Sequence, residues 1–205
     1  MYFRPICTAL IMSSAALALS ACTTPAYTGP VEVTRFVGEA PEMPLSGPIA
    51  LAPAPDATQE EKQGLENATF RAAVGEQLEL LGFVIDPDAP ITAYVAAEQT
   101  VRQAARNGGV SVGGGAATGS HGSGLGLGVG INLNSLAGPP PDEVASILVV
   151  SIRPADFGPE LWSGRAQMIS TTNSDQTAPA AAAKRLASAL FAGFPGQSGE
   201  TIEVK

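Results

Sequence analysis

The feature that most limits what this chain can fold into is its amino terminus, which has the composition of a segment made to be removed. A start that carries Arg4 is followed by the apolar run 9–19 and by the small residues Ser20 and Ala21. This order of charge, apolar run and small residues is the layout of an export signal. A transmembrane helix needs roughly 20 apolar residues, and this run is shorter and ends at a polar Thr-Thr-Pro sequence. We therefore expect residues 1–21 to be a signal peptide that takes no part in the folded domain.

The end of this segment and the residue that follows it, Leu19, Ser20, Ala21 and Cys22, resemble the lipobox of bacterial lipoproteins. In those proteins a signal peptidase cuts before the cysteine, which becomes lipidated, so the resemblance implies a covalent lipid on Cys22. One acyl chain holds a protein on a bilayer only marginally, at about 0.8 kcal/mol per buried methylene, and the three chains typical of bacterial lipoproteins would hold it permanently. The residue after the cysteine is threonine in place of the aspartate that retains many lipoproteins in the inner membrane, which favours the outer membrane, facing the periplasm. A secretory signal cut elsewhere is the alternative, and it leaves the position of the cysteine unexplained.

The composition of the remaining chain excludes several classes of function. Cys7 leaves with the signal peptide and Cys22 carries lipid, so disulfides, thiol catalysis and cysteine–metal sites are not available. The chain has 11 basic and 19 acidic residues, a formal net charge of −8 at pH 7. This charge gives no electrostatic basis for binding nucleic acid and repels anionic head groups. The length predicts one domain, at 31–195, after a lipidated tether at 22–30 and before a loose tail at 196–205.

Two segments have the periodicity of amphipathic helices. The first is predicted at 58–81, with Thr58 as its N-cap, Glu61 in the capping-box position and Gly82 as its left-handed end. The second is predicted at 178–192, because Pro179 is compatible with a first helical turn. The apolar stripes of the two helices are Leu65, Phe70, Val74, Leu78 and Leu81, and Ala183, Leu186, Ala187, Leu190 and Phe191.

Strands are predicted where apolar and polar residues alternate with a period of two. The segment 147–150 is apolar on both faces, which indicates a central strand. Trp162 shares a face with Gly164 and Ala166, so we expect it in the core with a helix packed close by. The predicted fold is α+β, a mixed and mostly antiparallel sheet of five to seven strands with both helices on one face, plus a Gly-rich hairpin insert. The expected strands are Val31–Phe36, Ile49–Ala52, Ile91–Arg102, Ile147–Val150 and Leu161–Met168.

The insert spans residues 108–138. Eleven of the chain's 23 glycines lie in it, between Gly108 and Gly130. It lacks the Gly-Lys-Ser/Thr ending of a phosphate loop, and His121 in its Gly/Ser tip is not held firmly enough for a general base. We expect a hairpin that extends the sheet. Alternatively, its aliphatic face contacts a partner, or a ring of subunits closes a barrel in the membrane. That face consists of Leu125, Leu127, Val129, Ile131 and Leu133.

Acidic residues in the chain have simpler roles than catalysis or metal binding. Asp86 and Asp88 stand in a Pro-rich stretch, where aspartates satisfy local amides in a turn, and no third acidic ligand is near enough in sequence to suggest calcium. The glutamates at 66, 76, 79 and 98 are typical of solvated faces. We therefore expect no catalytic residues, no metal site and no cofactor beyond the lipid on Cys22.

Several short patterns together resemble the lipoprotein family called domain of unknown function 4136. The resemblance covers most of residues 31–192 and implies an envelope lipoprotein with an α+β domain. It supplies no catalytic residues. The patterns are the lipobox, Leu80–Leu81–Gly82–Phe83, Asp86–Pro87–Asp88, Ile147 to Ile152, and Leu161–Trp162–Ser163–Gly164–Arg165–Ala166.

These inferences predict a protein that is not an enzyme. The leading hypothesis is an outer-membrane-anchored periplasmic lipoprotein with an envelope or accessory role exerted through contacts with envelope proteins. One alternative is a pocket for a lipid or another small apolar ligand between the sheet and the helices, beside Trp162. The other is an oligomeric pore built from the Gly-rich hairpins. The sequence leaves the partner and the oligomeric state open.

Overall fold

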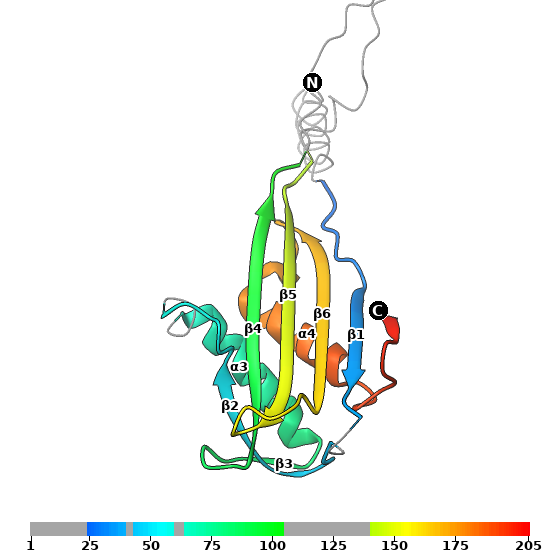
Figure 1. Cartoon of the computed structure of the whole chain (residues 1–205). Coiled ribbons are helices and arrows are strands. Elements are labelled where there is room, and N and C mark those ends of the chain that lie inside the picture. Colours follow the sequence, from blue (N-terminus) through cyan, green and yellow to red (C-terminus); the bar gives the residue numbers. More distant parts are fainter. Residues whose placement is uncertain (1–23, 40–42, 60–63, 105–139) are drawn as a thin grey trace, which may run out of the picture. The chain divides into compact units, whose positions relative to one another are not determined.

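The computed structural model describes residues 24–39, 43–59, 64–104 and 140–205 (Figure 1). Contacts divide the chain into two units, Met1–Pro25 with Ala104–Pro141, and Ala26–Gln103 with Asp142–Lys205. The second unit contains the sheet and both helices. The predicted signal peptide, Cys22 and the Gly-rich insert with its aliphatic residues lie outside the described residues.

The second unit is built on one seven-stranded sheet with the strand order β3-β2-β4-β5-β6-β1-β7. Strand β2 is parallel to both β3 and β4, and the other neighbouring pairs are antiparallel. The predicted α+β fold with a mixed, mostly antiparallel sheet is confirmed, and so is the central position of the strand at 147–150. The strands are β1 (Val31–Val37), β2 (Gly47–Pro53), β3 (Phe83–Ile85), β4 (Ile91–Arg102), β5 (Glu143–Pro154), β6 (Trp162–Thr171) and β7 (Thr201–Val204).

Helices α3 (Leu65–Leu80) and α4 (Pro179–Phe191) lie on the same face of this sheet (Figure 1), and a short 3-10 turn, η3 (Asp175–Thr177), precedes α4. Pro179 occupies the first turn of α4, where its missing N–H is harmless. The whole predicted stripe of α4 is buried, and Gly193 follows it with φ +74. The second predicted helix is confirmed.

The first predicted helix is wrong as one continuous helix, because the backbone is extended at Gly64. Gln59 is helical, but Gly64 is extended, with φ −61 and ψ 134, and it precedes α3 without a side-chain cap. Because α3 begins afresh after this break, Leu65 is 84% exposed and does not belong to the buried stripe. From Phe70 onward the stripe is correct, and Gly82 ends the helix with φ +94 as predicted.

The predicted tether is partly a strand extension. The backbone from Tyr27 to Gly29 continues along β6, where Thr171 N donates to Tyr27 O at 2.9 Å and Gly29 N donates to Ile169 O at 2.8 Å. Thr28 forms an isolated bridge with Ser170 between these two bonds. Unpaired backbone groups beside a strand are satisfied by continuing the ladder, so residues 27–29 are held along β6 and do not form part of a tether.

The predicted loose tail is also wrong, because its last residues form β7 on the outer side of β1. The sequence of β7 alternates, and Ile202 and Val204 pack against the core while Thr201 and Glu203 are exposed. Thr201 Oγ1 lies 2.9 Å from Thr34 Oγ1 across the pair. The tail was mistaken for coil because the alternation is only four residues long.

The core lies between the sheet and the two helices, with Trp162 at its centre and no exposed surface. Its ring stacks on Phe191 at a centroid distance of 5.4 Å, and its Nε1 donates to Pro195 O at 2.9 Å. A Cβ at Gly164 would lie 2.5 Å from the Trp162 ring and 2.7 Å from Leu190 Cδ1. The prediction of Trp162 in the core beside a closely packed helix is confirmed.

Candidate functional site

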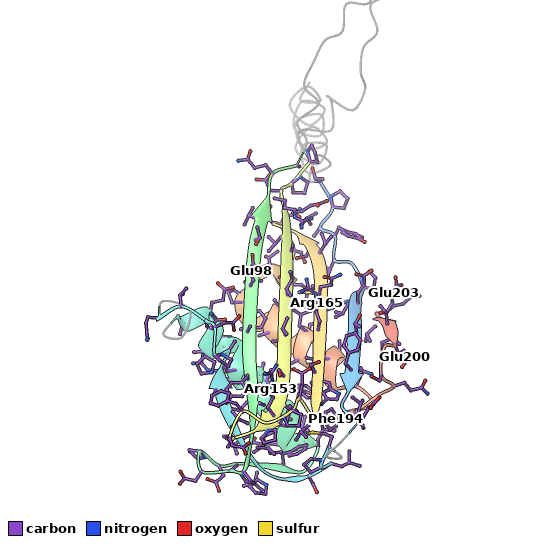
Figure 2. All side chains as sticks on the ribbon, viewed as in Figure 1. Glu98, Arg153, Arg165, Phe194, Glu200 and Glu203 are labelled. Carbon is purple, nitrogen blue, oxygen red and sulfur yellow. The ribbon has the colours of Figure 1, made fainter. Side chains whose placement is uncertain are left out.

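The face of the sheet that the helices leave open carries most of its polar chemistry. Residues on β6 alternate, so Trp162, Gly164 and Ala166 are buried under α4 while Arg165 is exposed. Figure 2 shows Arg165 on β6 and Glu98 on β4, both on strands at the centre of the sheet. The open face is therefore where a ligand or partner could meet charged side chains.

A groove of about 350 Å³ lies on this open face, toward the end of the sheet where β4 ends and β5 begins. Ala145 and Ile147 of β5 and Met168 and Ile169 of β6 form its apolar part. Its polar part comes from five strand residues, and the chain before β1 forms one wall. The polar residues are Glu32, Arg102, Ser146, Arg165 and Gln167, and the wall is Tyr27, Gly29 and Pro30.

Three of these polar side chains form a row that Gln167 holds in place. In the sheet register Gln167 stands directly opposite Glu32 of β1, and its Nε2 donates to Glu32 Oε2 at 2.6 Å. Arg165 donates from Nε and Nη2 to Gln167 Oε1 at 3.4 and 3.3 Å. The amide thus stands between a carboxylate and a guanidinium that do not pair with each other.

Arg165 and Arg102 are charges without an acidic partner in the described part of the chain. The ion pair found there joins Arg153 to Glu160 at 3.0 Å. A guanidinium presents its donors in a planar fork that matches the oxygens of a phosphate or carboxylate. An anionic group entering the groove would therefore find a donor that is not already neutralised.

The Arg153–Glu160 pair belongs to a second polar cluster at the other end of the open face, and this cluster fixes the β5–β6 turn. Ser151 Oγ donates to Glu160 Oε2 at 2.6 Å and accepts from Arg153 Nε at 3.0 Å. Burial raises the pKa of Glu160, but hydrogen bonds from Ser151, Ser163 and Arg153, with the charge of Arg153, outweigh it and lower that pKa. The Ser151 hydroxyl donates its proton to a hydrogen bond with the Glu160 carboxylate. This arrangement stabilises the turn and does not activate the serine as a nucleophile.

The acidic turn predicted at Asp86 and Asp88 has the expected role. Asp86 Oδ1 accepts from Asp88 N at 3.0 Å, so the side chain satisfies a local amide. In the ranges that the structure describes, no three His, Cys, Asp or Glu side chains are grouped to hold a metal. None of the helices there is long and apolar enough to cross a membrane.

The two segments predicted to carry function join the described domain at one end of the sheet. Arg102, the last residue of β4 before the insert, pairs with Glu143, the first residue of β5 after it. Glu143 pairs in turn with Thr171, whose N–H donates to Tyr27 O. The chain leading back to Cys22 and both ends of the insert therefore attach to adjacent positions.

Sequence reasoning missed the groove itself. The period-two alternation alone puts Arg165 and Gln167 on the face opposite Trp162, and Glu32 on the face opposite Val31 and Val33. What it could not provide was the strand order, which brings β1, β5 and β6 together. The wall formed by Tyr27 was hidden in a segment interpreted as a tether.

Comparison with known proteins does not show a family for this chain. No family model matches the chain. An uncharacterized protein of Zymomonas mobilis is 39% identical over 64 residues, which cover 31% of this chain and 24% of that protein. The matched part thus spans about a quarter of the relative's length.

The solved structures that match this chain are distant in sequence, and their TM-scores are below 0.5. A PelC dodecamer from Paraburkholderia phytofirmans has a TM-score of 0.41 at 11% identity, over 82% of this chain and 99% of that one. A second PelC dodecamer structure has a TM-score of 0.37 at 12% identity, and the match covers 78% of this chain and 94% of that one. A PDZ domain protein from Parabacteroides distasonis has a TM-score of 0.48 at 11% identity, and the match covers 95% of this chain and 42% of that one. These likenesses carry no argument about what this chain does.

Proposed function

We propose that this chain is a lipoprotein of the outer membrane, anchored through Cys22 and facing the periplasm, with a non-catalytic role in contacts between envelope proteins. We also propose that it belongs with the family called domain of unknown function 4136. The support is the lipobox-like Leu19–Ser20–Ala21–Cys22, the order of short patterns along the chain, and the way the described domain receives its two attached segments.

The observation that carries the proposal is the shared attachment end. Tyr27 is the first residue bound to β6 through its backbone, and it is five residues from Cys22. Five residues of chain reach at most about 18 Å. A lipid on Cys22 would therefore hold the sheet by this end, close to the bilayer. The Gly-rich insert starts and finishes at the same end, where partners in the membrane are within reach.

The polar clusters of the open face support a role without catalysis. Ser151, Arg153 and Glu160 are used to fix a turn. Arg165, Gln167 and Glu32 are arranged to contact a charged group. This arrangement suits binding.

The anchor is tested by replacing Cys22 with serine and fractionating the cells. The wild-type protein should be found in the outer membrane, while Cys22→Ser should keep its signal peptide and leave the outer-membrane fraction. Cys7→Ser is the matched control, since it removes a thiol of the signal peptide and should change nothing. A Cys22→Ser protein that is processed and sorted like the wild type would contradict the proposal.

The role of the insert is tested by deleting residues 108–138 and repeating a crosslinking pull-down. The pairing of Arg102 with Glu143 brings the cut ends together, so a short Gly/Ser linker can close the gap. We expect the deletion to remove specific envelope partners while the unfolding midpoint stays close to that of the wild type. An unchanged set of partners would take the insert out of the proposed function.

A further inference from the structure

The open-face groove combines a narrow apolar strip with charges of both signs. Ala145 of β5 pairs with Ile169 of β6, and Ile147 lies two residues further along β5 on the same face. Ile169 is 42% exposed although it is large and apolar. The strip is one residue pair wide, so it offers contact to a single chain of methylenes.

The inner end of the strip presents two opposite charges that the protein keeps apart. Glu32 stands opposite Gln167, and Arg165 is two residues along β6, a diagonal separation of about 7–8 Å. The bonds from Arg165 to the Gln167 amide are long, at 3.3 and 3.4 Å, and leave its donors available. Such a pair fits a ligand that carries a phosphate beside an ammonium group.

The outer end of the strip is the attachment end of the sheet, with Tyr27 and Arg102 at its mouth. Arg165 pairs with Val149, which is six residues from Glu143 at the start of β5. At 3.3 Å per residue, Val149 and Glu143 are about 20 Å apart along the strand. One leaflet of a bilayer is about 15 Å of hydrocarbon, half of a core about 30 Å thick. The open face between Arg165 and the end of the sheet is therefore long enough for one acyl chain that points toward the anchored end, and the strip itself lines about 7 Å of that length.

We propose that this groove binds a monoacyl phospholipid with a zwitterionic ethanolamine head group, taken from the membrane that holds the chain. Its phosphate contacts Arg165, its ammonium contacts Glu32, and its acyl chain lies on Ala145, Ile147 and Ile169. The groove volume of about 350 Å³ lies within the roughly 300–1,000 Å³ of small-molecule sites. A zwitterionic head group also avoids the repulsion that a net charge of −8 exerts on anionic lipids. The membrane source of this ligand rests on the proposed function, whereas the chemistry of the groove does not.

The test is native mass spectrometry of the full mature chain, purified in a nonionic detergent and titrated with decanoyl lysophosphatidylethanolamine. We expect a single saturable adduct. Arg165→Gln should weaken it at least tenfold, and Ile169→Asp, which places a charge on the strip, should do the same independently. Lys184→Gln is the matched control, because Lys184 is an exposed cation on α4 at the helix side, and its adduct should stay within twofold of the wild type.

Head-group preference tests the assignment of Glu32. The wild type should bind the ethanolamine lipid at least fivefold more tightly than its choline and glycerol counterparts, and Glu32→Gln should abolish this preference. Adducts that accumulate without saturation, or that are equal in Arg165→Gln and Lys184→Gln, would overturn the inference.

The same spectra separate the two proposals. A chain with covalent lipid that forms no specific adduct refutes the groove and leaves the anchor standing. A chain without covalent lipid that still forms the adduct refutes the anchor and the membrane source of the ligand.

Discussion

The two faces of β5 differ in burial, because one face lies under the helices and the other is open. Leu148, Val150 and Ile152 point under the helices and are fully buried, whereas Ile147 and Val149, which alternate with them in sequence, are half-buried on the open face. The covered face has one charged residue among the described strand positions, and the open face has several. Changes on the covered face should therefore alter the free energy of unfolding, and changes on the open face should alter binding.

The charged exception on the covered face is Arg35 of β1, which is 4% exposed. Its Nε donates to Leu190 O at 2.9 Å, and its Nη2 donates to Ala189 O and Ala192 O at 3.1 and 2.8 Å. These carbonyls are at the end of α4, where no further helical N–H is available. Burial lowers the pKa of Arg35, and the nearby charge of Glu200 raises it in part. The guanidinium thus completes α4, so even this charge serves stability.

Among the substitutions that test the division between the two faces, Trp162→Ala should change the free energy of unfolding the most. Removing a fully buried indole should destabilise the fold by about 3–5 kcal/mol, measured by urea unfolding followed by circular dichroism. Phe36→Ala, at a ring that is 53% exposed on β1, should cost about 0.5 kcal/mol. Equal losses for the two variants would contradict the division between the faces.

Arg35→Leu should have the next largest effect, about 2–3 kcal/mol, because it leaves buried carbonyls at the end of α4 without donors. Arg165→Leu removes the same charge from the open face and should change the unfolding free energy by less than about 0.5 kcal/mol. Thermal and urea unfolding of the two variants give the comparison. A neutral Arg35→Leu would show that water can replace the guanidinium.

Gly164→Ala should destabilise by about 1–3 kcal/mol, since the added Cβ would meet the Trp162 ring and Leu190. Arg165→Ala, at the next residue of the strand, points to the open face and should stay within about 0.5 kcal/mol of the wild type. The measurement is the urea midpoint. A Gly164→Ala protein as stable as the wild type would mean that the contact between α4 and β6 can shift freely.

The smallest effect is expected from Glu160→Gln on the open face. The Arg153 and Glu160 side chains are 41% and 36% exposed, so solvent screening limits the loss to less than about 1 kcal/mol at pH 7. The pKa of Glu160 is lowered from its ordinary 4.5, so its contribution is present above that value and is lost as the pH falls through the lower folded pKa. Unfolding curves of wild type and variant should therefore converge at acid pH. A difference that stays constant as the pH falls through the acid range would contradict this origin.

The fold was largely predictable because most of its elements carry strong periodic patterns. The alternation of β4 and the Pro179-led stripe of α4 gave their positions to within a residue. The errors share one cause, which is that short segments depend on neighbours distant in sequence. Thr201–Val204 is a strand only because β1 offers an unpaired edge, and Tyr27 is fixed only because β6 continues past β1.

The groove could not be predicted for the same reason. The sequence indicates which side of β6 Arg165 occupies, but its neighbours Glu32 and Ile147 come from strands more than 100 residues apart in sequence. Their adjacency is set by the strand order, which local patterns do not encode. The role of Arg35 was hidden likewise, since its position beside Val31 and Val33 gave the face but not the end of α4.

The central claim is that one end of the open-faced sheet is held on a membrane through Cys22. The most direct test is the intact mass of the protein purified from the membrane fraction, combined with the identity of its first residue. The account predicts a chain that starts at Cys22 and carries a diacylglyceryl group and an amide-linked acyl chain. A chain that still carries residues 1–21, or one with an unmodified Cys22, would contradict it.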